Sequence, residues 1–284
     1  MSSIVKNFKY YFLGILFLGA VFVWYAVLAE TRSGLKVAFL DVGQGDAIFV
    51  EAPNGNQVLI DGGPNKSVLR ALSKQMPFYD RTVDGIILTH PHLDHYGGLV
   101  DVLDNYKINF ETDSGNDNPE SKGFDIYARK LEEEKAKRIF AKKGMRVNLD
   151  KGLYLDILLP VINKKGMSAH DEMVVARLIY GNNSFLLTGD MEDNLENYLL
   201  GFGGSLRSDV LKVGHHGSKT STSENFLGAI RPSLAVISVG KNNKYGHPKK
   251  EIIDRLAKFE IPILRTNEKG TIIIKSDGEK IIVK

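Results

Sequence analysis

The sequence predicts an α/β (α+β) fold, with two β-sheets covered by helices and one apolar helix before them. Short β-like runs followed by helical stretches occur twice along residues 30–284, and this order favours two sheets with helices outside. No linker or internal repeat interrupts that region, so we count it as one domain. Of the 284 residues, 43% are hydrophobic and 25% are charged, which is ordinary globular composition and argues against a disordered chain.

The apolar helix is expected at residues 10–29, which contain no charged side chain. A helix of this length can cross a bilayer core of about 30 Å. Lys6 and Lys9 precede it, so the positive-inside rule puts residues 1–9 in the cytoplasm and residues 30–284 outside as an extracytoplasmic domain. We interpret the segment as a membrane signal-anchor. Two alternatives stay open: a signal peptide, whose cleavage gives a secreted protein, and a buried core helix.

Strands are expected wherever short β-branched or apolar runs end at turn residues. These runs are 37–42, 47–52, 57–61, 85–89, 153–159, 173–180, 184–188, 209–213 and 234–239. The Asn-Gly pair at 54–55 and the Gly-Asn-Asn turn at 181–183 each predict a hairpin. Two closing hairpins are expected at 267–270 and 276–279. Helices are expected at 124–143, 192–200 and 224–230.

Composition excludes several kinds of chemistry. The chain has no cysteine, so disulfides, thiolate catalysis and cysteine-held metal sites are ruled out. Its net charge of +3 is too small to indicate nucleic-acid binding by itself. Any bound metal must therefore be held by the seven histidines and by carboxylates.

The strongest functional motif is HPHLDH at residues 90–95, directly after the expected strand 85–89. Its four candidate ligands are His90, His92, Asp94 and His95. Imidazole and carboxylate groups suit zinc or manganese, and this spacing can serve two ions about 3.5–4 Å apart, as in two-metal hydrolases. The glycines at 97–98 allow a following helix to approach closely. We therefore predict a site for two divalent metal ions (Zn or Mn).

Further ligands are expected from distant parts of the chain. Asp190 ends the strand 184–188 and can bridge two cations. His215 and His216 follow another strand, and we favour His215 as the metal ligand and His216 as a catalytic residue. His170 is a weaker candidate ligand.

His247 is a candidate proton donor, phosphate contact or ligand. Ser218 and Lys219 are candidate substrate-binding residues, because Ser221 and Glu224 fit a capping box for the next helix. A helix N-terminus beside a lysine suits a phosphate group. A helix cap without a substrate role is an equally good interpretation of this stretch.

These motifs, in this order, resemble the metallo-β-lactamase superfamily, and more narrowly the hydrolase domain of ComEC-type DNA-uptake (competence) proteins. The narrower match rests on FLDVGQGDA at 39–47, LIDGG at 59–63, VGHHGS at 213–218 and YGHP at 245–248. The resemblance implies a four-layer αββα sandwich of two mixed sheets. ComEC-type domains often carry Asp in place of His92, and Asn or Asp near His170. They also belong to a multi-helix channel protein, whereas this chain has one candidate span and would need a separate membrane channel protein.

The resemblance also implies the role of each ligand. His90 and His92 would bind the first metal, Asp94 and His95 the second, with Asp190 bridging and His215 completing the second set. The expected enzyme is a metal-dependent phosphodiesterase or nuclease acting on DNA, in which a metal-activated hydroxide attacks phosphorus. Asp94 would orient the hydroxide, and His216 or His247 would protonate the leaving oxygen. Two alternatives remain: hydrolysis of a small ester (a phosphodiester head group, lactone or β-lactam), and a non-catalytic DNA-binding module.

Overall fold

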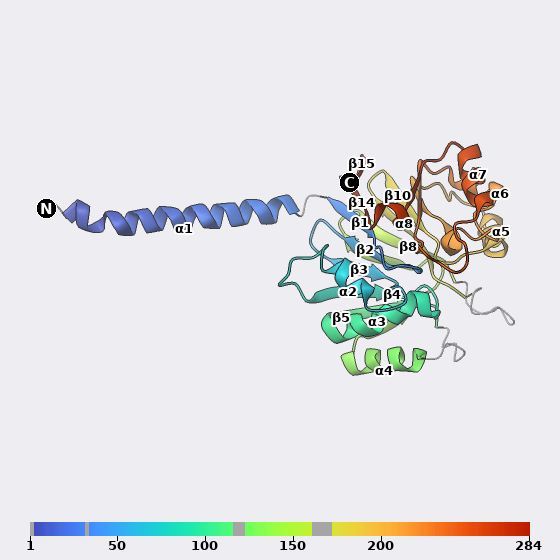
Figure 1. Cartoon of the computed structure of the whole chain (residues 1–284), viewed down its shortest axis with the longest axis horizontal. Coiled ribbons are helices and arrows are strands. Elements are labelled where there is room, and N and C mark those ends of the chain that lie inside the picture. Colours follow the sequence, from blue (N-terminus) through green and yellow to red (C-terminus); the bar gives the residue numbers. More distant parts are fainter. Residues whose placement is uncertain (1–2, 32–33, 116–122, 161–171) are drawn as a thin grey trace.

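The computed structural model describes residues 3–31, 34–115, 123–160 and 172–284 (Figure 1). Helix α1 (Ser3–Thr31) projects away from the rest of the chain as one continuous rod. Its segment Asn7–Tyr25 is apolar and long enough to span a bilayer. The helix therefore includes the predicted apolar segment, and none of that window is buried against protein.

The remaining chain forms two mixed sheets. The first has the order β15-β14-β1-β2-β3-β4-β5-β6 and the second the order β13-β12-β11-β10-β9-β8-β7. The strands of the first sheet are β1 (Leu35–Phe39), β2 (Ile48–Glu51), β3 (Gln57–Ile60), β4 (Thr82–Ile87), β5 (Lys107–Asp113), β6 (Lys137–Phe140), β14 (Ile272–Ser276) and β15 (Ile281–Val283). Those of the second are β7 (Arg146–Asp150), β8 (Leu153–Leu159), β9 (Val175–Tyr180), β10 (Asn183–Leu187), β11 (Val210–Lys212), β12 (Leu234–Ile237) and β13 (Ile263–Arg265).

Each sheet has a parallel half and an antiparallel half. Strands β3 to β6 are parallel, as are β10 to β13. The predicted hairpins at Asn54-Gly55, at 181–183 and at 276–279 are confirmed by the antiparallel pairs β2–β3, β9–β10 and β14–β15. The carboxyl ends of parallel strands lie at one edge of each sheet, and loops at such edges commonly carry functional groups.

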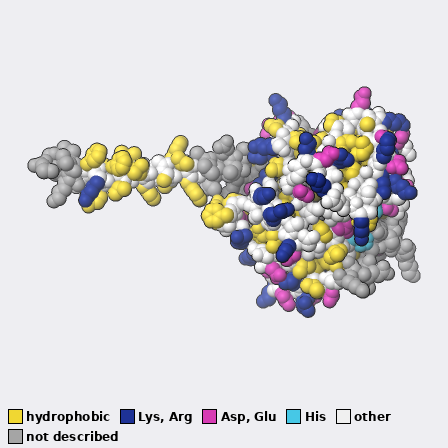
Figure 2. All heavy atoms as spheres, viewed as in Figure 1, with side chains coloured by type: hydrophobic (Ala, Val, Ile, Leu, Met, Phe, Trp, Pro, Cys, Tyr) yellow, Lys and Arg dark blue, Asp and Glu magenta, His cyan; other side chains and the backbone are white. Residues whose placement is uncertain are grey.

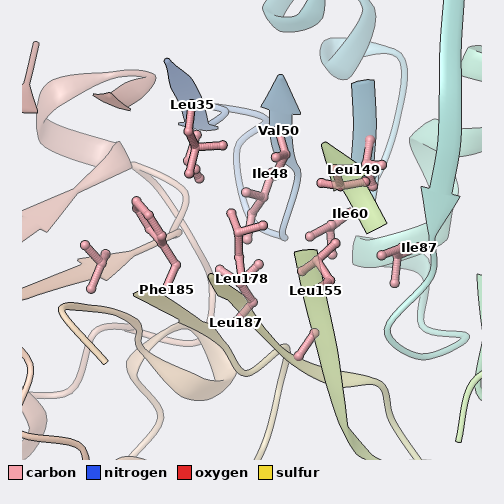
Figure 3. Packing of buried hydrophobic residues seen from close by; sticks show 14 of the residues in the cluster. Leu35, Ile48, Val50, Ile60, Ile87, Leu149, Leu155, Leu178, Phe185 and Leu187 are labelled. Carbon is pink, nitrogen blue, oxygen red and sulfur yellow. The ribbon is translucent and has the colours of Figure 1, made fainter. Parts of the chain in front are cut away.

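The two sheets face each other across an apolar core (Figure 3). Ile48, Val50 and Ile60 of the first sheet point toward Leu155 and Leu178 of the second. Buried residues alternate along β8, so one face of this strand enters the layer between the sheets. The predicted pairing of two sheets is confirmed.

Helices cover the outer faces, which completes the four layers. One apolar cluster joins the first sheet to its helices, and another joins the second sheet to its own. The first group is α2 (Ser67–Leu72), α3 (Leu93–Asn105) and α4 (Phe124–Glu134); the second is α5 (Asp193–Gly201), α6 (Glu224–Ile230) and α7 (Lys250–Lys258). A short helix, α8 (Thr266–Lys269), connects the sheets.

Two predicted elements are wrong. The helix expected at 124–143 ends at Glu134, because Lys135 adopts a left-handed conformation (φ 58°), and residues 137–140 form β6 instead. The many Lys and Glu residues there fit an exposed edge strand as well as a helix face. The hairpin expected at 267–270 is α8, since the preceding strand β13 belongs to the other sheet. The local composition does not show to which sheet a strand belongs.

Candidate metal centre

The HPHLDH motif occupies the junction between β4 and α3. His92 is the N-cap of α3, and Asp94 and His95 lie in the first helical turn. The glycines after the motif have the predicted role: a Cβ on Gly98 would overlap the carbonyl oxygen of Gly62. In addition, the amide of Gly62 donates a hydrogen bond to the carbonyl of His95 (2.6 Å). The close contact of α3 with Gly62, in the turn after β3, fixes the position of the start of the helix. It therefore also fixes the position of the motif.

Asp190 lies at the centre of the candidate site. Its Oδ2 atom is 3.3 Å from His95 Nε2, 3.9 Å from His90 Nε2 and 3.7 Å from His215 Nε2. Its Oδ1 atom is 3.5 Å from His216 Nε2. The two oxygens thus face different imidazoles, which is the arrangement that a bridging carboxylate requires.

Four groups from this set lie close enough to share one ion. Donor atoms of Asp94, His95, Asp190 and His216 all lie within 4.8 Å of one another. His95 Nε2, Asp190 Oδ1 and His216 Nε2 are buried and lack a hydrogen-bond partner among the described residues. Unpaired buried polar atoms are costly. Donors of these types, unpaired and convergent, fit a divalent cation.

His90 and His92 lie beside this group. The Nε2 atom of His90 is 2.9 Å from Nδ1 of His92, and the rings of His90 and His95 are 4.1 Å apart. The structure thus brings together every predicted ligand of known position. His170 lies outside the described residues.

The other ring nitrogen of each central histidine has its own acceptor. His95 Nδ1 donates to Asp61 (2.8 Å), and His216 Nδ1 donates to the carbonyl of Ser238 (2.9 Å). Asp61 is held in turn by the amide of Thr89 (2.8 Å). Such acceptors fix the tautomer that leaves Nε2 free to bind a metal.

His215 differs from His216 in exposure. Its Nδ1 donates to Glu192 Oε1 (2.9 Å), and its side chain is 26% exposed, whereas that of His216 is 2% exposed. Both residues have left-handed backbone conformations (φ 44° and 53°), which are uncommon for non-glycine residues. This backbone is what directs two adjacent imidazoles to the same carboxylate.

The electrostatics favour positive charge at the centre. Burial by itself lowers the pKa of His216, but Asp190 and Asp46 outweigh it and raise this pKa to about 10. Burial also lowers the pKa of His95, but Asp190 and Asp61 outweigh it and hold this pKa well above its usual range. Burial raises the pKa of Asp190, but His216 and His95 outweigh it and hold that pKa well below its ordinary value. The carboxylates thus stabilise either protons or a cation here.

Lys212 is a component that the sequence analysis missed. Its side chain is fully buried, forms an ion pair with Asp46 and donates to the carbonyl of Gly189 (2.7 Å). Its Nζ atom is 3.9 Å from Asp190 Oδ1. Lysine is almost never fully buried unless it is paired. The signal in the sequence was the position of this lysine within a strand of otherwise apolar residues, which indicates a buried charge with a partner.

His247, predicted to contact substrate, lies beside His215. His247 is 6.0 Å from His215, ring to ring, and its ring stacks on that of Tyr245. Burial and the nearby His215 lower the pKa of His247 to about 4, so this imidazole is neutral at pH 7 in the free protein.

The predicted capping box is wrong. The N-cap of α6 is Ser223, which accepts from the amide of Phe226, whereas the hydroxyl of Ser221 donates to the carbonyl of Gly214 (2.7 Å). Ser221 is therefore bonded to the turn that carries the histidines, and the helix begins after Ser223. Lys219 is exposed nearby, and the hydroxyl of Ser218 pairs with that of Thr220.

Beside Asp94 opens a cleft of about 450 Å³. Its lining combines amide side chains, one lysine and exposed apolar groups: Val42, Gly43, Gln44, Pro64, Asn65, Leu93, Asp94, Asn242, Asn243, Lys244 and Tyr245. Leu93 and Tyr245 are 55% and 50% exposed. The cleft thus borders the candidate metal centre at Asp94.

Two mixed sheets between layers of helices, with imidazole and carboxylate donors clustered at one site, are the features by which the chain is compared with known proteins. The sequence matches the metallo-beta-lactamase superfamily over residues 40–241, and the chain belongs to that superfamily.

Similar curated proteins include ComE operon protein 3 of Bacillus subtilis (strain 168), 34% identical over 84% of this chain and 32% of that protein. Another is competence protein ComA of Neisseria gonorrhoeae, 31% identical over 89% of this chain and 34% of that protein. The chain thus spans about a third of the length of these relatives.

Solved structures agree on the fold. The Zn(2+)-bound PqqB from Methylobacterium extorquens has a TM-score of 0.51 at 12% identity, covering 78% of this chain and 85% of PqqB. CmlA, a diiron beta-hydroxylase from Streptomyces venezuelae, has a TM-score of 0.57 at 11% identity, covering 86% of this chain and 54% of CmlA. At such identities, these likenesses concern the fold alone.

Proposed function

We propose that this protein is a metal-dependent phosphodiesterase that cleaves DNA at the outer side of a membrane, to which α1 anchors it. The observation that carries the proposal is the convergence of donors on Asp190, whose carboxylate lies within 4 Å of His90, His95 and His216. His95, Asp94 and His216 would bind one divalent cation, and His90 and His92 another, with Asp190 between them. Zinc and manganese both suit these ligands.

In this assignment His216 is a ligand and His215 faces the substrate. His216 is the more enclosed and belongs to the convergent group, while His215 is held by Glu192 and lies next to His247 at the rim. Two bound cations would supply an activated water and stabilise charge on the phosphoryl oxygens. Neutral His247 can donate a hydrogen bond to a phosphate oxygen or to the leaving group.

The cleft beside Asp94 supports a nucleic acid as the substrate. The half-exposed ring of Tyr245 offers a surface on which a base can stack, as aromatic side chains do in single-strand binding proteins. Lys244 lines the same cleft and can neutralise a phosphate. The competence relatives agree with a role in DNA uptake, where a separate membrane channel protein would be the partner.

The test is cleavage of labelled single-stranded DNA by the full chain in detergent, with Mn²⁺, Zn²⁺ or EDTA, beside Asp190→Ala. We expect cleavage that requires metal and is lost in the variant. Full metal occupancy without DNA cleavage would overturn the proposal. Turnover of a small chromogenic phosphodiester alone would then indicate a small-ester hydrolase. DNA affinity that falls with salt, without any turnover, would indicate a binding module.

A further inference from the structure

Two aromatic residues form the tip of a turn between α2 and β4. The amide of Asp80 donates to the carbonyl of Pro77 (3.0 Å), which closes a turn with Phe78 and Tyr79 in the centre. Phe78 is 83% exposed and Tyr79 is 51% exposed. Turn tips favour Gly, Asn, Asp and Ser, so two exposed aromatic rings are unusual there. Exposed apolar groups that lie together commonly mark a surface that contacts a partner or a membrane.

The base of this turn is held firmly by the first sheet. Lys36 Nζ donates to the carbonyl of Gln75 (2.7 Å) on one side. On the other, the carboxylate of Asp80 accepts from Gln57 Nε2 (2.9 Å) and from the amide of Thr82 (3.1 Å). The aromatic tip is therefore presented in a fixed position.

The tip meets α1 near the end of its apolar segment. The rings of Trp24 and Tyr79 are 6.4 Å apart, and the rings of Tyr79 and Phe78 are 5.4 Å apart. Trp24 precedes the end of α1 at Thr31 by seven residues, or about 10 Å of helix. The loop thus reaches back along the helix, on the side from which α1 leaves the sheets (Figure 1).

We propose that the turn Pro77–Asp80 is a second membrane contact, inserted into the interfacial layer of the bilayer that α1 spans. The inference rests on the anchor role proposed for α1 above. Tryptophan and tyrosine at the end of a membrane span lie at the headgroup level, and Tyr79 contacts such a tryptophan. Lys74 and Arg81 flank the turn and are exposed, so anionic headgroups complement it.

This contact sets the direction in which the candidate metal centre faces. The turn precedes β4, and the HPHLDH motif follows the other end of this strand, six residues or about 20 Å away. The histidines visible in Figure 2 accordingly lie on the side of the domain away from α1. The centre would face water and not the lipid headgroups, which favours a soluble polymer over a lipid head group as the substrate.

The sequence permits a direct test, because Trp24 is its single tryptophan. The full chain is inserted into vesicles of phosphatidylcholine and phosphatidylglycerol that contain a dibrominated phosphatidylcholine, which quenches nearby indole rings. Wild type reports on α1. The double variant Trp24→Phe/Phe78→Trp reports on the turn. Trp24→Phe/Phe202→Trp is the matched control, since Phe202 is an exposed aromatic residue (39%) beyond the distant helix α5.

We expect quenching and a blue-shifted emission maximum for Trp24 and for the tryptophan at position 78, and neither for the one at position 202. Quenching at position 78 no greater than at 202, with Trp24 quenched, would overturn the contact and leave the anchor. No quenching of Trp24 would overturn both. The DNA-cleavage assay is read in detergent, so its failure is distinguishable from either result.

Discussion

The Oδ1 atom of Asp190 lies 3.5 Å from the Nε2 atom of His216, while the other oxygen of the same carboxylate faces His95 at 3.3 Å. This carboxylate therefore contacts imidazoles carried by both sheets, and in the proposed assignment it belongs to both sets of ligands.

Replacement of this carboxylate by an amide of the same shape is expected to remove metal from both sets. Asp190→Asn should lower the metal affinity by at least the 10–100-fold typical of lost supporting contacts, and should reduce cleavage at least as much, since an amide cannot balance two cations. Metal content after gel filtration and the cleavage rate measure this. Asp193→Asn, an exposed acid on α5, is the control and should change neither. Unchanged metal content in Asp190→Asn would contradict the bridging role.

The candidate ligands could be predicted because their signals are local. HPHLDH directly follows a buried strand, and Asp190 ends another, so position in the sequence gives position at the sheet edge. The choice between His215 and His216 depends on left-handed backbone angles that sequence spacing does not encode. Lys212 and Glu192 were missed because each is recognised only by a partner distant in the chain. Edge strand β6 was missed because its charged residues resemble those of α4.

The two adjacent histidines should separate metal binding from turnover. His216→Ala removes a buried member of the convergent group, so the protein should lose metal. His215→Ala removes a more exposed ring and should keep its metal content while cleavage falls by about 10²–10³-fold, the range for loss of one hydrogen-bond donor to the transition state. Metal content and rate are measured on the same samples. Equal metal loss in both variants would contradict this division.

The buried ion pair of Lys212 with Asp46 is expected to stabilise the fold only as a pair. Lys212→Met leaves the Asp46 carboxylate buried without its partner and should cost about 3–5 kcal/mol in the free energy of unfolding. Adding Asp46→Leu should recover part of this loss. Urea unfolding of the two single variants and the double variant gives the coupling energy. Strict additivity would show that the pair does not interact.

The glycine contact under α3 predicts opposite effects at two helical glycines. A Cβ at Gly98 would overlap Gly62, so Gly98→Ala should displace α3, lower the thermal midpoint and weaken metal binding. Gly228 on α6 has no atom within 4 Å of its would-be Cβ, so Gly228→Ala should stabilise the protein by about 0.5–1 kcal/mol. Thermal unfolding and metal content distinguish the two variants. A stabilised Gly98→Ala protein would contradict the close packing of α3.

A last prediction concerns Glu111, which is buried on β5 and is not one of the candidate metal ligands. Burial and the neighbouring Asp113 raise the pKa of Glu111 to about 8, although the hydroxyl of Tyr127 donates to its carboxylate. A raised folded pKa means that the unfolded chain, with a carboxyl pKa of about 4.3, loses this proton first. The contribution of Glu111 to stability is therefore complete below about pH 4.3 and is lost as the pH rises to 8.

Glu111→Gln is neutral at every pH and should remove this dependence. Across pH 5–8 the wild type should lose on the order of several kcal/mol relative to the variant, as a pKa shift of this size implies for a buried carboxyl. Urea unfolding at several pH values measures the difference. Glu133→Gln, an exposed glutamate on α4, should run parallel to wild type. A constant difference between wild type and Glu111→Gln would mean that Glu111 is ionised throughout, with Arg138, 3.7 Å away, compensating its charge.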